Sequence, residues 1–149
     1  MKAMNISFSP PDMSDMEIQE VADTIKSGWI TTGPKTKELE RQIAKYVGVN
    51  RCVCLNSQTA CGEMALRVLG IGAGDEVIVP AYTYSASASI VDHVGAKIVF
   101  VDVQEGCLEM DYDKMEAAIT EKTKAIIPVD LGGVPCDYDK IFAIVEKKK

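Results

Sequence analysis

The residues best suited to bind a ligand are Ser57, Gln58 and Thr59, which lie where a short apolar segment runs into an apolar-periodic helix. The first turn of a helix leaves backbone N–H groups without intrahelical partners and carries partial positive charge. A phosphate group suits that position, and the hydroxyl and amide side chains offer further donors. Ser57 or Thr59 could equally be a simple helix cap. The pattern therefore predicts either an anion-binding turn or an ordinary helix start.

A second candidate is Tyr84, which follows the next apolar segment just beyond Pro80. An aromatic side chain beside a phosphate site can stack on a planar ring. A phosphate combined with a ring indicates a nucleotide or pyridoxal phosphate as the ligand. Tyr82 and Tyr84 could instead be ordinary packing residues, and the residues alone leave both interpretations open.

An alternating α/β fold would bring these groups together. From residue 51 onward, short apolar runs alternate with helix-length segments, which is typical of β-α-β units and a mostly parallel sheet flanked by helices. We expect strands at 51–55, 76–79, 97–101 and 125–129, and helices at 59–69, 85–94, 112–120 and 138–146. Ligands of such sheets bind beyond the carboxyl ends of the strands, where 56–59, 80–84, 102–104 and 130–133 fall.

The first fifty residues differ from this pattern. Two helices are expected at 16–27 and 36–47, joined by a loop at 28–34 that contains Trp29. Trp29 could simply anchor this loop. The predicted organisation is an amino-terminal helical part with a loop at 1–50 and an α/β domain at 51–149.

Composition bounds the class of protein. The chain has 149 residues, of which 47% are hydrophobic and 26% charged, as expected for one soluble globular unit with a core. A net charge of −6 argues against nucleic acid as a partner. Five cysteines without a C-x-x-C pair and a single histidine, His93, give no metal-ligand spacing. With neither a signal peptide nor a membrane-length apolar stretch, the expected location is the cytoplasm.

Five blocks of the chain resemble, in order, blocks of the DegT/DnrJ/EryC1/StrS family of sugar aminotransferases. They are GWITTGPKTKELERQIAKYVG, LNSQTA, LGIGAGDEVIVPAYTYSASASIV, VGAKIVFVDV and TKAIIPVDLGGVPCDYDKI. The resemblance implies the aspartate aminotransferase (type I) fold, here as part of its large domain. It also implies pyridoxal 5'-phosphate as the cofactor.

The same resemblance assigns roles to the candidate residues. The turn formed by Ser57, Gln58 and Thr59 would hold the cofactor phosphate, and Tyr84 would stack on the pyridine ring. Gln58 is a departure, because many relatives have glycine or alanine there.

Weaker candidates lie near the implied substrate pocket. They are Trp29, Thr31, Thr32 and Gly33 in the first loop, and Asp130, which stands where a histidine is common.

The implied reaction transfers an amino group from an amino-acid donor, glutamate, to a keto-sugar nucleotide or similar carbonyl. The family's Schiff-base lysine and the aspartate that pairs with the pyridinium nitrogen are expected beyond Lys149, so the chain resembles an amino-terminal portion that is inactive alone. We expect it to form a homo-oligomer.

Two alternatives stay open, and a third is disfavoured. One is a non-catalytic fragment that retains only the phosphate-binding turn, and another is a sugar dehydratase of the same family. A dinucleotide-binding enzyme is disfavoured, because the first strand-turn-helix lacks G-x-G-x-x-G.

Overall fold

The computed structural model describes residues 9–148. The chain divides into two compact units between Cys54 and Leu55. The functional division into 1–50 and 51–149 stays a prediction.

The first unit contains two helices, α1 (Asp15–Lys26) and α2 (Pro34–Val47). The helix α1 starts with a capping box, in which the Ser14 side chain accepts from the Met16 backbone N–H and Glu17 reaches back to Ser14. The helix α2 starts on a proline, whose missing N–H costs nothing there, and is capped after Val47 by Gly48, which has a φ of 78°. Both predicted helices are confirmed, with shifted starts.

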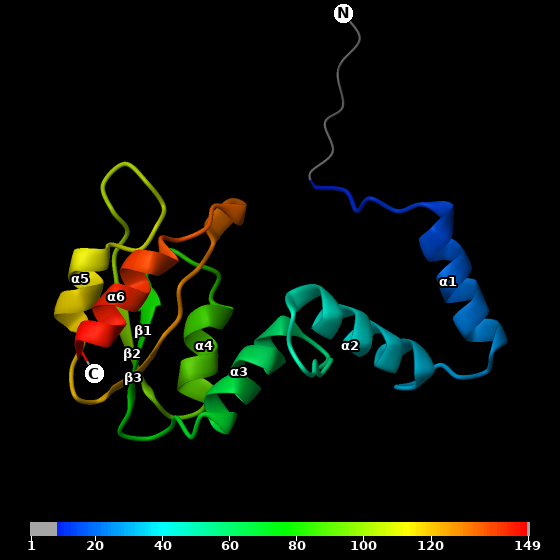
Figure 1. The fold of residues 1–149 in the computed structure, drawn as a ribbon, viewed down its shortest axis with the longest axis horizontal. Coiled ribbons are helices and arrows are strands. Elements are labelled where there is room, and N and C mark those ends of the chain that lie inside the picture. The colour runs from blue at the N-terminus through cyan, green and yellow to red at the C-terminus, as the bar shows by residue number, and fades with distance from the viewer. Residues whose placement is uncertain (1–8, 149) are drawn as a thin grey trace, which may run out of the picture. The chain divides into compact units, whose positions relative to one another are not determined.

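The second unit is a three-stranded parallel sheet covered by helices (Figure 1). Its strands are β1 (Glu76–Pro80), β2 (Lys97–Val101) and β3 (Thr123–Ile126), in the order β2-β1-β3. Ile78 of β1 pairs with Val99 on one side and Ile126 on the other. The helices are α3 (Gln58–Val68), α4 (Ala86–His93), α5 (Tyr112–Ala118) and α6 (Tyr138–Lys148), with a short 3-10 turn η1 (Leu131–Gly133).

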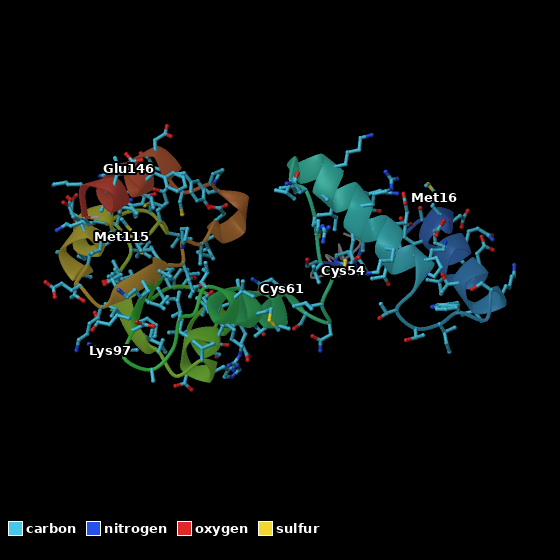
Figure 2. The ribbon with its side chains drawn as sticks, turned by 60° about the horizontal axis from the view of Figure 1, so that its bottom comes forward. Met16, Cys54, Cys61, Lys97, Met115 and Glu146 are labelled. Carbon is cyan, nitrogen blue, oxygen red and sulfur yellow. The ribbon has the colours of Figure 1, made fainter. Side chains whose placement is uncertain are left out.

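The two faces of the central strand β1 supply two separate cores. Val77 and Val79 point to one face, where they pack with Leu66 of α3 and Ile90 of α4. Ile78 points to the other, where the buried partners come from β2, α5, α6 and the connecting loops: Val101, Met110, Tyr112, Met115, Cys136, Ile141 and Ile144. Met115 of α5, labelled in Figure 2, is fully buried in this second core. Alternation along a strand thus places α3 and α4 on one face and α5 and α6 on the other.

The strand predicted at residues 51–55 is wrong. The segment belongs to no sheet, and the three strands among the described residues pair only with one another. Burial still alternates along the segment, because Cys52 and Cys54 are half-buried whereas Val53 is exposed. An alternating pattern marks two faces, but a strand also needs a neighbouring strand to pair with, and within residues 9–148 this segment pairs with no strand.

The last predicted strand is displaced rather than absent. It was expected at 125–129 but forms at Thr123–Ile126. Pro128 has no backbone N–H to donate, which limits the ladder at that end. The backbone N–H of Ile127 still donates to the Ile78 carbonyl, at 2.9 Å.

Candidate cofactor-binding site

The turn before α3 combines a helix cap with free backbone donors. Ser57 has extended backbone angles, φ −162° and ψ 159°, and its Oγ accepts from the Ala60 backbone N–H at 3.0 Å. The Ser57 carbonyl accepts from Cys61 at 3.1 Å, as the first bond of the helix. Within residues 9–148, no acceptor reaches the backbone N–H of Gln58 or Thr59. Ser57 is therefore a cap, and two donors beside it remain available to an anion.

Tyr84 is an exposed aromatic residue just ahead of α4. Its side chain is 79% exposed, so within the described residues it does not serve as a packing residue. Its backbone is ordered by the start of the helix, because the Tyr84 carbonyl accepts from the Ser87 N–H at 3.0 Å. The Thr83 and Ser87 hydroxyls, 2.9 Å apart, close the same turn. The ring is thus presented to solvent from a fixed backbone.

The helices α3 and α4 start at the same level. A Cβ on Gly62 would lie 2.7 Å from Cδ1 of Ile90, so the two helices are in close contact there. Gly62 and Ile90 occupy equivalent places, each one turn after the first residue of its helix. The side chain of Arg67, late in α3, donates to the carbonyl of His93, the last residue of α4, at 3.1 Å. The Ser57–Thr59 turn and Tyr84 are consequently at the same end of this helix pair.

Asp130 follows β3 and holds its own loop. Its carboxylate accepts from the Cys136 backbone N–H and from the Tyr138 hydroxyl, both at 3.0 Å. These hydrogen bonds, the Cys136 bond foremost, hold the pKa of Asp130 below its usual value. The structure thus shows Asp130 tying 131–138 together. A role toward a substrate stays a prediction.

The loop candidates belong to the other unit. Trp29 Nε1 donates to the Thr32 carbonyl at 3.1 Å, and the Trp29 ring covers Gly33 so closely that a Cβ there would lie 1.9 Å from Nε1. Trp29 therefore folds over its own loop and requires glycine at position 33. Thr31 and Thr32 are exposed, and a substrate role for this loop stays a prediction.

Two features of the α3–α4 pair that carries this site were not found from the residues alone. Gly62 permits the contact between α3 and α4, and the signal available was an isolated glycine inside a helical pattern. The pairing of His93 with Glu63 joins residues far apart in the chain, so no local pattern indicates it.

Neither a metal cluster nor a membrane span is present among the described residues. No group of three or more Cys, His, Asp or Glu side chains in residues 9–148 could hold a metal ion. No helix in that range is both long and apolar enough to cross a bilayer.

The family model for the DegT/DnrJ/EryC1/StrS aminotransferases matches residues 11–149. That match covers nearly the whole sequence. The chain belongs to the DegT/DnrJ/EryC1/StrS aminotransferase family.

Relatives of this family agree with the match. The chain is 44% identical over 141 residues to the spore coat polysaccharide biosynthesis protein SpsC of Bacillus subtilis, covering 95% of this chain and 36% of SpsC. It is 45% identical over 149 residues to the UDP-4-amino-4-deoxy-L-arabinose–oxoglutarate aminotransferase of Shewanella sediminis, covering 98% of this chain and 38% of that protein. The chain thus spans little more than a third of these relatives.

A solved relative confirms the fold. Spr1654 of Streptococcus pneumoniae, designated a sugar aminotransferase, is 63% identical, and its PLP form superimposes with a TM-score of 0.93 over 97% of this chain and 37% of that one. Its PMP form gives a TM-score of 0.94. Pyridoxal phosphate is therefore the cofactor of the family, and the predicted type I fold class is confirmed.

Proposed function

We propose that this chain supplies the phosphate- and ring-binding part of the cofactor site in a pyridoxal-phosphate-dependent aminotransferase. The observation that carries the proposal is the placement of the Ser57–Thr59 turn and exposed Tyr84 at one end of the α3–α4 pair. The family and its PLP-form relative support this choice of ligand. The residues that would do the binding are those singled out from the sequence.

The turn fits a phosphate in charge and in donors. The backbone N–H groups of Gln58 and Thr59 point out of the first turn of α3, where the helix dipole favours an anion. The hydroxyl of half-buried Thr59 is a further donor at that position. Gln58 is exposed, which supports a side chain that stays in solvent and leaves the backbone accessible. We therefore assign phosphate binding to the backbone of 58–59 and the Thr59 hydroxyl.

Tyr84 would supply the flat surface for the cofactor ring. Stacking on a tyrosine contributes affinity through apolar contact and ring electrostatics, about 0.5–1.5 kcal/mol beyond the buried area. The cofactor, when bound, serves as an electron sink for amino-group transfer. The residues of this chain would bind and orient it, while the Schiff-base lysine and the pyridinium-pairing aspartate are expected outside these 149 residues.

The proposed reaction moves an amino group from glutamate to a keto-sugar nucleotide or similar carbonyl. The naming of one relative as an oxoglutarate aminotransferase of an aminosugar nucleotide supports both partners. We propose that the loop residues Trp29–Gly33 and Asp130 lie near the substrate, as weaker candidates than the cofactor-binding residues.

We also propose that the protein forms a homo-oligomer and is located in the cytoplasm. Exposed apolar side chains, Ile18 and Val21 of α1 and Phe142 of α6, support self-association.

Titration with pyridoxamine 5'-phosphate tests the proposal, because this form of the cofactor cannot react with surface lysines. We expect saturable binding by equilibrium dialysis, competed by inorganic phosphate. Tyr84→Ala should weaken pyridoxamine phosphate binding about threefold to tenfold and leave inorganic phosphate binding unchanged, because only the ring contact is lost.

The matched control is Tyr46→Ala, which removes a 93% exposed tyrosine from α2 and should change neither affinity. Absence of binding by the unsubstituted chain would contradict the cofactor proposal. Binding of phosphate with no preference for the ring, and no effect of Tyr84→Ala, would favour the non-catalytic alternative with a phosphate turn alone.

A further inference from the structure

A polar network ties α3 to the last turn of α4, away from the candidate cofactor site. Glu63 Oε1 accepts from Nε and Nη2 of Arg67 at 3.0 and 2.8 Å, and Glu63 Oε2 lies 3.0 Å from Nδ1 of His93. Arg67 also donates to the His93 carbonyl, which as a helix-terminal group has no intrahelical partner. Both the ring and the backbone of the last residue of α4 are therefore held by α3.

Glu63 is the centre of this network. Its side chain is only 29% exposed, and each of its two oxygens has a partner. The hydrogen bonds from Arg67 first, and from His93 second, hold the pKa of Glu63 below its ordinary value of 4.5, so Glu63 is charged at neutral pH. An exposed pair within one helix contributes little, but this carboxylate also joins two helices.

The close contact beside Glu63 is the point about which α4 can tilt against α3. Gly62 and Ile90 are in close contact, and Ile90 lies between His93, the last residue of α4, and Tyr84, which precedes the first residue of α4 by two positions. Along the helix axis, His93 is about 4.5 Å from Ile90, and Ala86 at the start of the helix is about 6 Å from Ile90 on the other side. A tilt about this contact that moves His93 would therefore move the start of α4, and with it Tyr84, in the opposite direction.

We propose that Glu63 is a positioning residue that, through Arg67 and His93, fixes the tilt of α4 and so sets Tyr84 relative to the Ser57–Thr59 turn. The assignment rests on the proposed cofactor function, since it gives Tyr84 its purpose. It predicts that Glu63 affects binding of the ring and not of the phosphate.

The test compares Glu63→Gln with Glu116→Gln. Glu116 is an equally exposed glutamate, at 29%, that joins α5 to α6 through Lys147 on the other face of the sheet. Glu63→Gln should weaken pyridoxamine phosphate binding about fivefold, within the range of one stacking contact, and leave inorganic phosphate binding unchanged. Glu116→Gln should alter neither affinity, although both variants lose the charge of a glutamate that joins two helices.

A double-mutant cycle isolates the coupling. In a Tyr84→Ala background, Glu63→Gln should have no further effect on pyridoxamine phosphate binding, because the ring that it positions is gone. The same fivefold loss in that background would overturn the proposal, as would a loss of inorganic phosphate binding that points to general loosening of α3.

A readout without ligand separates this inference from the proposed function. In the ¹H–¹⁵N spectrum of the unliganded chain, Glu63→Gln should shift the amide signals of Tyr84 and Ser85, while Glu116→Gln should not. Unchanged signals would overturn the positioning role whether or not the cofactor binds. Shifted signals in a chain that fails to bind pyridoxamine phosphate would contradict the proposed function and retain the coupling between Glu63 and Tyr84.

Discussion

Ser57 has a role that its residue type alone could not decide. Its hydroxyl caps α3 through Ala60, which satisfies one donor of the first turn, while the donors of Gln58 and Thr59 stay available. Capping and anion binding are therefore compatible at this turn. A substitution that keeps the cap but changes the charge can separate them.

We predict that Ser57→Asp leaves the stability of the chain unchanged and weakens its binding of phosphate. Aspartate caps helices as well as serine does, so the free energy of unfolding should change by less than about 0.5 kcal/mol. The added negative charge beside the first turn should lower the affinity for inorganic phosphate about tenfold, since like charges a few ångströms apart repel by about 1 kcal/mol or more. Urea unfolding and phosphate titration provide the two measurements.

Ser14→Asp is the control for that experiment, because the Ser14 side chain also caps a helix, α1, in the other unit. It should leave phosphate binding unchanged. Unaltered phosphate affinity in Ser57→Asp would contradict the anion-binding role of the turn and leave Ser57 as a cap alone.

At the scale of elements, Glu76 joins the sheet at the amino ends of its strands. It is a buried carboxylate at the start of β1 whose Oε1 accepts from Lys97 Nζ of β2 at 2.8 Å. Its Oε2 accepts from the Thr120 hydroxyl at 2.6 Å, just before β3. One side chain thus links β1 to β2 and to the segment just before β3, at the end opposite the candidate site. Lys97 marks this end in Figure 2.

The Glu76 bridge predicts a loss of stability in acid. The hydrogen bond from Lys97, followed by that from Thr120, lowers the pKa of Glu76 below its ordinary value of 4.5. A carboxyl group with a depressed folded-state pKa contributes stability above its unfolded pKa, and that contribution is lost as the pH falls through the folded value. Glu76→Gln should therefore lower the melting temperature at pH 7, and its difference from the unsubstituted chain should shrink below pH 4.5.

Melting curves between pH 3 and 7 measure this effect. Glu121→Gln, at an exposed glutamate just before β3, serves as the control and should show no pH-dependent difference. A Glu76→Gln difference that stays constant across the range would contradict the charged bridge.

At the scale of the molecule, stability of the second unit depends on β1, which is buried along its whole length. Val77 and Val79 serve the core under α3 and α4, and Ile78 serves the core under α5 and α6. Both layers of helices depend on one strand. The first unit has a single buried residue in its two helices, Ala44, so its apolar side chains are mostly at the surface.

We predict that Ile78→Ala is strongly destabilising. Removing a fully buried isoleucine costs about 2–5 kcal/mol, because transfer energy is lost and a cavity remains. The same change at Ile25, 64% exposed in α1, should stay within about 0.5 kcal/mol. Urea denaturation followed by circular dichroism compares the two. Similar losses for both variants would show that Ile25 is covered in solution.

Much of the local structure follows from the sequence. Apolar patterning and helix-length segments predicted all six α-helices of residues 9–148, and Ser14, Pro34 and Gly48 account for the start of α1 and both ends of α2 through capping and backbone geometry. Short Val- and Ile-rich runs predicted β1 and β2, the latter with its observed bounds. These features are determined by neighbours in the chain, so a sequence pattern carries them.

Tertiary structure decided what depends on distant residues. The segment 51–55 alternates like a strand but forms none, because pairing requires a partner that no local pattern specifies. Ser57 and Tyr84 were candidates from the sequence and the family resemblance. Only the Gly62–Ile90 contact and the hydrogen bond from Arg67 to the His93 carbonyl place them at one end of a helix pair. The sequence by itself determined which groups could bind a phosphate and a ring, whereas long-range packing decided that they face the same end.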